Sequence, residues 1–172
     1  MMTPEMTSET GFDPLVRFAE IERLVGKIYF RFSHLFLHRP ALRDFWWQMA
    51  MEEERHACIL SAIRIVIENY PKEAIDPSIS QDKADHLKVR LLAYLRKGTP
   101  AITGEEAFRI ALEIESSEID AIYSKLLQLG GSQMAKMMEQ FGVPASAQIL
   151  KLKSALRQFT KDPELLAWTE SL

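Results

Sequence analysis

The sequence predicts an all-α fold, and three observations support this prediction. Apolar residues recur at intervals of three and four over long stretches, which is the spacing of one face of an α-helix. Proline and glycine fall between these stretches, where they would start or end helices. No window alternates between apolar and polar residues over the length of a strand between hairpin signals.

Capping residues and prolines set the ends of the expected helices. Asp13-Pro14 is typical of a helix start, because Asp caps free N–H groups and Pro fits the first turn. Thr103-x-x-Glu106 is a capping-box pattern that predicts another start, and Gly130-Gly131 predicts the end of that helix. The expected helices span about residues 14–38, 40–70, 87–97, 103–129, 134–141 and 149–159, and a short terminal helix or tail starts at 162–163.

The chain is expected to form one domain, because 172 residues can bury a substantial core without disulfides. We expect a flexible N-terminus at residues 1–12, a helical bundle at 13–161 and a terminal helix or tail at 162–172. The connection after the second main helix, about residues 71–102, is too long for a tight hairpin. It indicates a four-helix bundle with a long crossover, containing a short helix, between main helices 2 and 3.

Composition and charge exclude several classes of function. Apolar residues make up 47% and charged residues 26%, and the net charge of −3 gives no reason to expect nucleic acid or a membrane surface as a partner. The single cysteine, Cys58, excludes intrachain disulfides and a four-cysteine metal site. No signal peptide is recognisable in residues 1–12, and no apolar run approaches the ~20 residues that span a bilayer. A cytoplasmic location is therefore expected.

Glu53 and His56 form an E-x-x-H sequence within an apolar helical pattern. Three residues are a little less than one helical turn, so both side chains project from the same face. A carboxylate and an imidazole buried together are costly unless something pairs them. Di-metal helix bundles use this spacing to bind iron or manganese, although any helical protein can show E-x-x-H by chance.

Two other helices place glutamates on faces that are predicted to point inward. Glu22 falls inside the apolar stripe of the first helix, whereas Glu20 falls among charged residues. Glu115 and Glu118 both fall on the apolar face of the helix expected at 103–129. Taken singly, each glutamate is more often a rim residue whose head reaches water. Together with the E-x-x-H pair they predict a site for iron or manganese, with zinc as an alternative.

These motifs, in this order, resemble a rubrerythrin-type protein of the ferritin-like superfamily, over about residues 13–161. The resemblance is carried by the helix order and by four groups of residues: Glu22-x6-Tyr29, Phe45-Trp46-Trp47 before Glu53-x-x-His56-Ala57, Glu115-x-x-Glu118, and Tyr123. It implies one or two metal ions held by Glu22, Glu53, His56 and Glu115, with Glu118 as a supplementary ligand. It also implies reaction with peroxide or oxygen, and a homodimer.

The chain departs from this family in two respects. Where the fourth helix of the family carries Glu-x-x-His, this sequence has Leu156 and Phe159. Glu139 is the nearest acidic alternative, and a helix from a partner chain is another way to complete the site. With one cysteine there is no rubredoxin-like domain, so a separate electron donor is expected. The alternatives to a redox protein are a degenerate bundle used for binding or assembly, and an oxygenase acting on an organic substrate.

Overall fold

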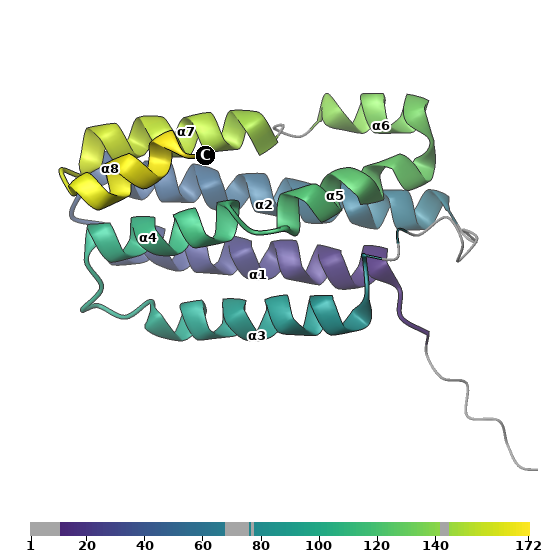
Figure 1. The fold of residues 1–172 in the computed structure, drawn as a ribbon, viewed down its shortest axis with the longest axis horizontal. Helices are drawn as coiled ribbons and strands as arrows, with labels where there is room; N and C mark the ends of the chain where they lie inside the picture. The colour runs from purple at the N-terminus through teal and green to yellow at the C-terminus, as the bar shows by residue number, and fades with distance from the viewer. Residues whose placement is uncertain (1–10, 68–75, 77, 142–144) are drawn as a thin grey trace, which may run out of the picture.

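In a computed structural model of the chain, eight α-helices make up most of the described residues, which contain no strand, so the all-α prediction is confirmed. The structure describes residues 11–67, 76, 78–141 and 145–172 (Figure 1). The helices are α1 (Pro14–Leu35), α2 (Pro40–Val66), α3 (Gln81–Lys97), α4 (Gly104–Glu115), α5 (Ile119–Leu127), α6 (Ser132–Glu139), α7 (Ala145–Phe159) and α8 (Pro163–Glu170).

The capping signals in the sequence act as expected. The Asp13 side chain accepts hydrogen bonds from the backbone N–H groups of Leu15 and Val16 at the start of α1. Thr103 and Glu106 form the reciprocal capping box of α4. The predicted flexible segment 1–12 lies mostly outside the described residues. So do the expected end of the second helix near Tyr70 and the first residues of the connection predicted at about 71–102.

The long helices α1 and α2 form the centre of the molecule. They run antiparallel and contact each other along their lengths (Figure 1). Trp46, fully buried on α2, stacks on Tyr29 of α1 with ring centroids 5.7 Å apart, and its other neighbours include Phe32 and Phe108. Burying aromatic rings of this size supplies a large share of the stability of a core. The pair α1–α2 is therefore a rigid base for the side chains between them.

The remaining helices surround this pair. The connection between α2 and α4 contains α3, which packs along α1. Figure 1 shows α4 and α5 running one after the other in the same direction, and α5 contacts both α1 and α2. The last long helix, α7, contacts α2 and α4, and α8 folds back against α4 and α7. Helices α1, α5 and α7 therefore all contact α2.

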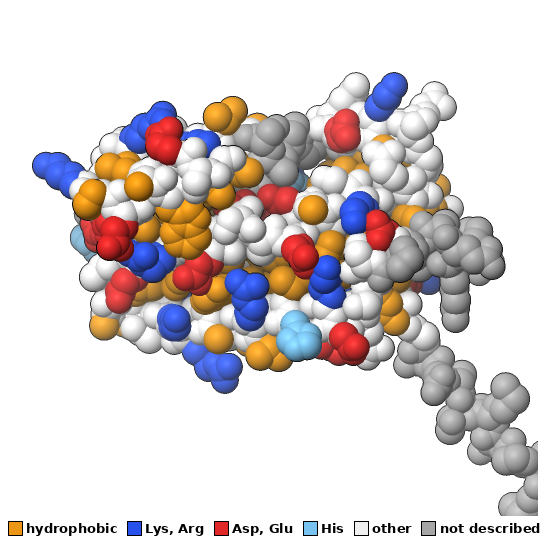
Figure 2. Space-filling model, in the orientation of Figure 1, with side chains coloured by type: hydrophobic (Ala, Val, Ile, Leu, Met, Phe, Trp, Pro, Cys, Tyr) orange, Lys and Arg blue, Asp and Glu red, His pale blue; other side chains and the backbone are white. Residues whose placement is uncertain are grey.

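The surface carries charges of both signs. Figure 2 shows acidic and basic side chains interleaved over the visible face, without a region of a single sign. Within the described residues, every helix is too short or too polar to cross a lipid bilayer.

One expected element is interrupted. The sequence predicts a single helix over residues 103–129, but the chain breaks after Glu115 and starts a new helix, α5, at Ile119. Ser116 Oγ donates to the carbonyl oxygen of Leu112 at 2.6 Å, and Ser117 Oγ accepts from the N–H of Ile119 at 3.4 Å. Serine side chains that bond to nearby backbone groups compete with the helical pattern. The two adjacent serines thus fit a change of register at this point.

Candidate metal centre

Glu22, Glu53 and His56 meet in the interior between α1 and α2. All three side chains are buried, and one ligand atom from each lies within 4.8 Å of the other two. His56 Nδ1 is 3.4 Å from Glu53 Oε2 and 3.9 Å from Glu22 Oε2. We call these three residues the triad.

Helix geometry and one glycine bring the triad together. Glu53 and His56 project from the same face of α2 because they are three residues apart. Gly26, one turn after Glu22 on α1, lies against α2: a Cβ atom added to it would sit 3.4 Å from the carbonyl oxygen of Ala50 and 3.4 Å from Glu53 Cβ. A Cβ atom at Gly26 would already be in van der Waals contact with α2, so the two helices lie close together beside the two carboxylates.

The carboxylate of Glu22 is in an unusual environment. Both of its oxygens are buried, and neither accepts a hydrogen bond from any described residue. Burial raises the pKa of Glu22 well above its ordinary value, and the nearby charge of Glu53 raises this pKa further. A buried carboxylate without a donor is costly. A proton or a cation beside Glu22 would remove that cost.

Glu115, at the end of α4, lies buried close to the triad. Its Oε1 accepts a hydrogen bond of 2.6 Å from the hydroxyl group of Tyr29 on α1. Burial raises the pKa of Glu115, and the charge of Glu53 adds to this shift, whereas the bond from Tyr29 lowers the pKa. Glu115 is thus in the interior as predicted, but a protein donor already engages one of its oxygens.

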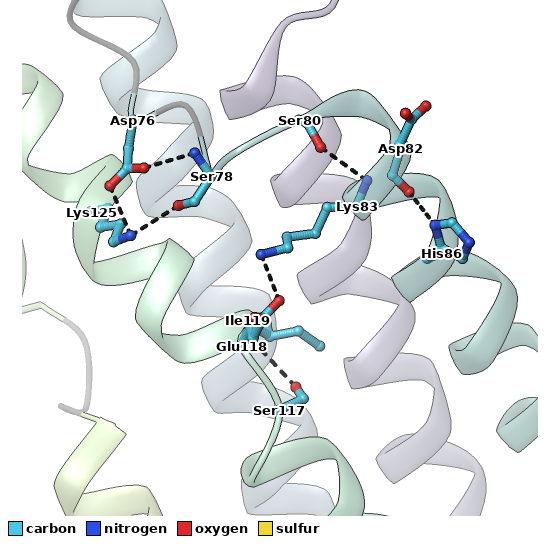
Figure 3. Close-up of polar contacts among 10 residues, drawn as sticks. All are labelled: Asp76, Ser78, Ser80, Asp82, Lys83, His86, Ser117, Glu118, Ile119 and Lys125. Carbon is cyan, nitrogen blue, oxygen red and sulfur yellow. Dashed lines mark hydrogen bonds and ion pairs between the residues drawn. The ribbon is translucent and has the colours of Figure 1, made fainter.

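Glu118 does not lie with the other predicted residues. Its side chain is 62% exposed, and Oε2 is 2.8 Å from Nζ of Lys83 on α3. Figure 3 shows the Glu118 side chain directed toward Lys83 from the turn that precedes α5. The expectation that Glu118 shares an inner face with Glu115 is corrected, because it assumed one continuous helix across the Ser116–Ser117 break.

Asp120, which the sequence analysis did not select, takes the inner position instead. Its Oδ2 is buried and receives no hydrogen bond from the described residues. Burial, followed by the charge of Glu53, raises the pKa of Asp120 to about 6. The signal for this residue was the pair Ser116-Ser117, since a break there shifts the inner face of the helix that follows.

A second residue that the sequence analysis did not select, Gln148 on α7, contacts the triad. Its Nε2 donates a hydrogen bond to Glu53 Oε1, and its own carbonyl oxygen is buried without a donor from the described residues. Leu156, where the resemblance would place a glutamate, is fully buried in the apolar core. Phe159 stacks on Phe108 with ring centroids 6.5 Å apart. The inward polar group of α7 is therefore an amide.

Tyr123 on α5 covers the imidazole of the triad. The rings of Tyr123 and His56 lie 4.3 Å apart between centroids, with 31° between their planes. Burial and the charge of Glu22 raise the pKa of Tyr123 above its ordinary value. Glu139, the other acidic alternative considered for the missing ligand, is exposed near the end of α6.

The triad fits a transition-metal ion. It offers two carboxylates and one imidazole, a donor set that suits iron, manganese or zinc. A cation would also give the two donor-free oxygens of Glu22 a partner. Comparison with known proteins identifies no relative: no family model matches the chain, and neither a curated protein nor a solved structure is detectably similar to it. The function of the triad is therefore inferred from its own geometry.

Proposed function

We propose that this chain is a metal-binding protein whose triad, Glu22, Glu53 and His56, holds iron or manganese, with zinc as the alternative. The observation that carries the proposal is the environment of Glu22, whose two buried oxygens lack a donor beside a second carboxylate and an imidazole. A proton or a cation would compensate such a group, and two carboxylates and an imidazole converging on one point are a donor set for a cation. Three side chains from two rigidly packed helices are well suited to hold one.

We further propose that the fold is ferritin-like and the protein rubrerythrin-type. The antiparallel pair α1–α2 and the placement of α3 in the connection between α2 and α4 support this assignment. So does the E-x-x-H pair, which lies on α2 opposite a glutamate of α1.

The proposed activity is redox chemistry toward peroxide or oxygen. A bound iron or manganese ion would supply the redox chemistry, and a separate protein would supply electrons, since the chain has one cysteine. The residues of the chain would bind and orient: Glu22, Glu53 and His56 as ligands, with the Tyr123 ring shielding His56 from water. In the metal-free protein, where burial raises the pKa of Asp120 to about 6, its carboxyl group would hold a proton below about that pH.

Metal analysis with matched variants tests the binding proposal. Protein purified from cells supplied with iron and manganese should contain at least about one ion per chain, because three buried donors converge. Glu22→Gln keeps the shape of the side chain but removes its charge, and it should lose the ion. Glu118→Gln removes an exposed charge of the same type and should retain it. Wild-type protein without metal under all loading conditions would refute the proposal.

The alternative is a degenerate bundle used for binding or assembly. It is favoured by α7, where Leu156 is fully buried and no carboxylate or histidine contacts the triad. Consumption of hydrogen peroxide by the metal-loaded protein, with an added reductant, separates the two. Turnover that disappears in Glu22→Gln supports the redox proposal. Metal binding without turnover leaves metal as a structural element of the bundle.

A further inference from the structure

The two oxygens of Glu53 face different partners, and this asymmetry bears on how many ions the centre holds. Oε2 lies beside His56 in the triad, whereas Oε1 accepts the amide N–H of Gln148. We propose that the centre holds a single metal ion, and that Gln148 is the positioning residue that keeps the count at one. This inference rests on the proposed metal-binding function, and its test is designed to separate the two.

The carboxylates divide into two kinds. Glu22 has two oxygens without a donor from the described residues, so it can offer both to an ion. Glu53 and Glu115 each have one oxygen engaged by a protein donor, Gln148 Nε2 and the Tyr29 hydroxyl respectively. A carboxylate that bridges two ions commonly offers one oxygen to each. A second ion at the engaged oxygen of Glu53 or Glu115 would therefore compete with one of these donors for a lone pair of that oxygen.

The structure also supplies only one imidazole to the cluster. Of the other histidines, His34 and His86 are exposed and bond through Nδ1 to the carbonyl oxygens of Phe30 and Asp82, at 3.0 and 2.8 Å. His38 is exposed just beyond the end of α1. A two-ion centre of the four-helix type uses one Glu-x-x-His pair from each of two helices. This chain has one such pair in its interior.

Two further buried acceptors come from α5 and α7. Asp120 Oδ2 and Gln148 Oε1 are buried acceptors without donors among the described residues. They do not complete a second position, because the amide of Gln148 contributes no charge and its N–H engages Glu53. A carboxylate at position 148 would remove the donor and add a charged ligand in one change. Both oxygens of Glu53 would then be available to bridge two ions.

Titration with Mn²⁺, followed by electron paramagnetic resonance, tests the inference. Wild-type protein should bind one equivalent and give the spectrum of isolated Mn²⁺. Gln148→Glu should bind two equivalents and show the spectrum of a magnetically coupled pair. Gln148→Leu is the matched control: it removes the donor without adding a ligand, so it should still bind one equivalent, with affinity lowered by about 10–100-fold, as for other residues that orient a ligand.

Each outcome bears on one of the two proposals. Two equivalents bound by wild-type protein, or one equivalent bound by a folded Gln148→Glu variant, overturns the inference that Gln148 sets the count. No binding by wild-type protein refutes the metal centre itself. Because the wild-type count alone decides whether one ion is held, the inference stays falsifiable even if a variant does not fold.

Discussion

The triad and the groups facing it come from two differently built parts of the molecule. On the side of α1 and α2, two uninterrupted helices of 22 and 27 residues supply Glu22, Glu53 and His56. On the other side, Glu115 ends one short helix, Asp120 begins the next, and Gln148 comes from a third. The first side leaves the Glu22 carboxylate open to an ion. Gln148 of the second side engages Glu53, and Tyr29 of the first side engages Glu115 across the interior. In both cases the carboxylate and the donor that engages one of its oxygens come from different helices.

The largest expected effect is a dependence of stability on pH in the metal-free protein. Burial raises the pKa of Glu22, Glu115 and Asp120 above their values in the unfolded chain. The folded protein then binds more protons than the unfolded protein, so the free energy of unfolding falls as pH rises through this range. With a chelator present, the melting temperature should be highest near about pH 5 and decrease steadily toward pH 8.

Below about pH 5, stability should fall again because other carboxylates have pKa values that folding lowers. Lys125 and Ser78 lower the pKa of exposed Asp76, and Arg157 lowers that of Glu170, so their contributions are lost in acid. A shallower slope above pH 5 in Glu22→Gln would assign part of the effect to the α1–α2 side. A melting temperature that rises from pH 5 to pH 8 in chelator would contradict the raised pKa values.

The next effect compares one carboxylate from each side. Glu22→Leu removes a buried charge without stranding any donor, so it should raise the free energy of unfolding of the metal-free protein at pH 8 by about 1–4 kcal/mol. Glu115→Leu leaves the Tyr29 hydroxyl without its acceptor, which costs about 1–3 kcal/mol, and it should gain less. Urea unfolding in chelator measures both. An equal increase in the free energy of unfolding for both variants would contradict the distinction between Glu22, which has no donor, and Glu115, which has one.

The smallest effect is expected at Glu118. Its ion pair with Lys83 is on the surface, and such pairs contribute about 0–1 kcal/mol. Glu118→Gln should therefore change the melting temperature little, and the affinity for Mn²⁺ should match that of wild-type protein. The same pair of measurements on Glu115→Gln provides the contrast. A loss of metal affinity in Glu118→Gln would place this residue at the centre after all.

The sequence was informative where helices are regular. The apolar stripe of α1 favoured Glu22 over Glu20, and the structure buries Glu22 and leaves the Glu20 side chain 49% exposed, bonded to Arg17. The inward position predicted for Glu118 was wrong, because the apolar spacing was extended along one continuous helix. The helix ends at Glu115, next to Ser116 and Ser117. Gln148 was missed because α7 was searched for carboxylates and histidine, and an amide on an apolar helix has no such signature.

Gly26 also has a consequence for the choice of ion. Because α2 lies against Gly26, the distance between the backbones that carry Glu22 and Glu53 is fixed by close contact. Two such helices cannot open by the thickness of a methyl group without losing the packing around them. Calcium needs longer bonds and more oxygen ligands than the smaller cations. The packing at Gly26 thus sets the backbone spacing beneath Glu22 and Glu53, and with it the size of ion that the proposed centre would favour.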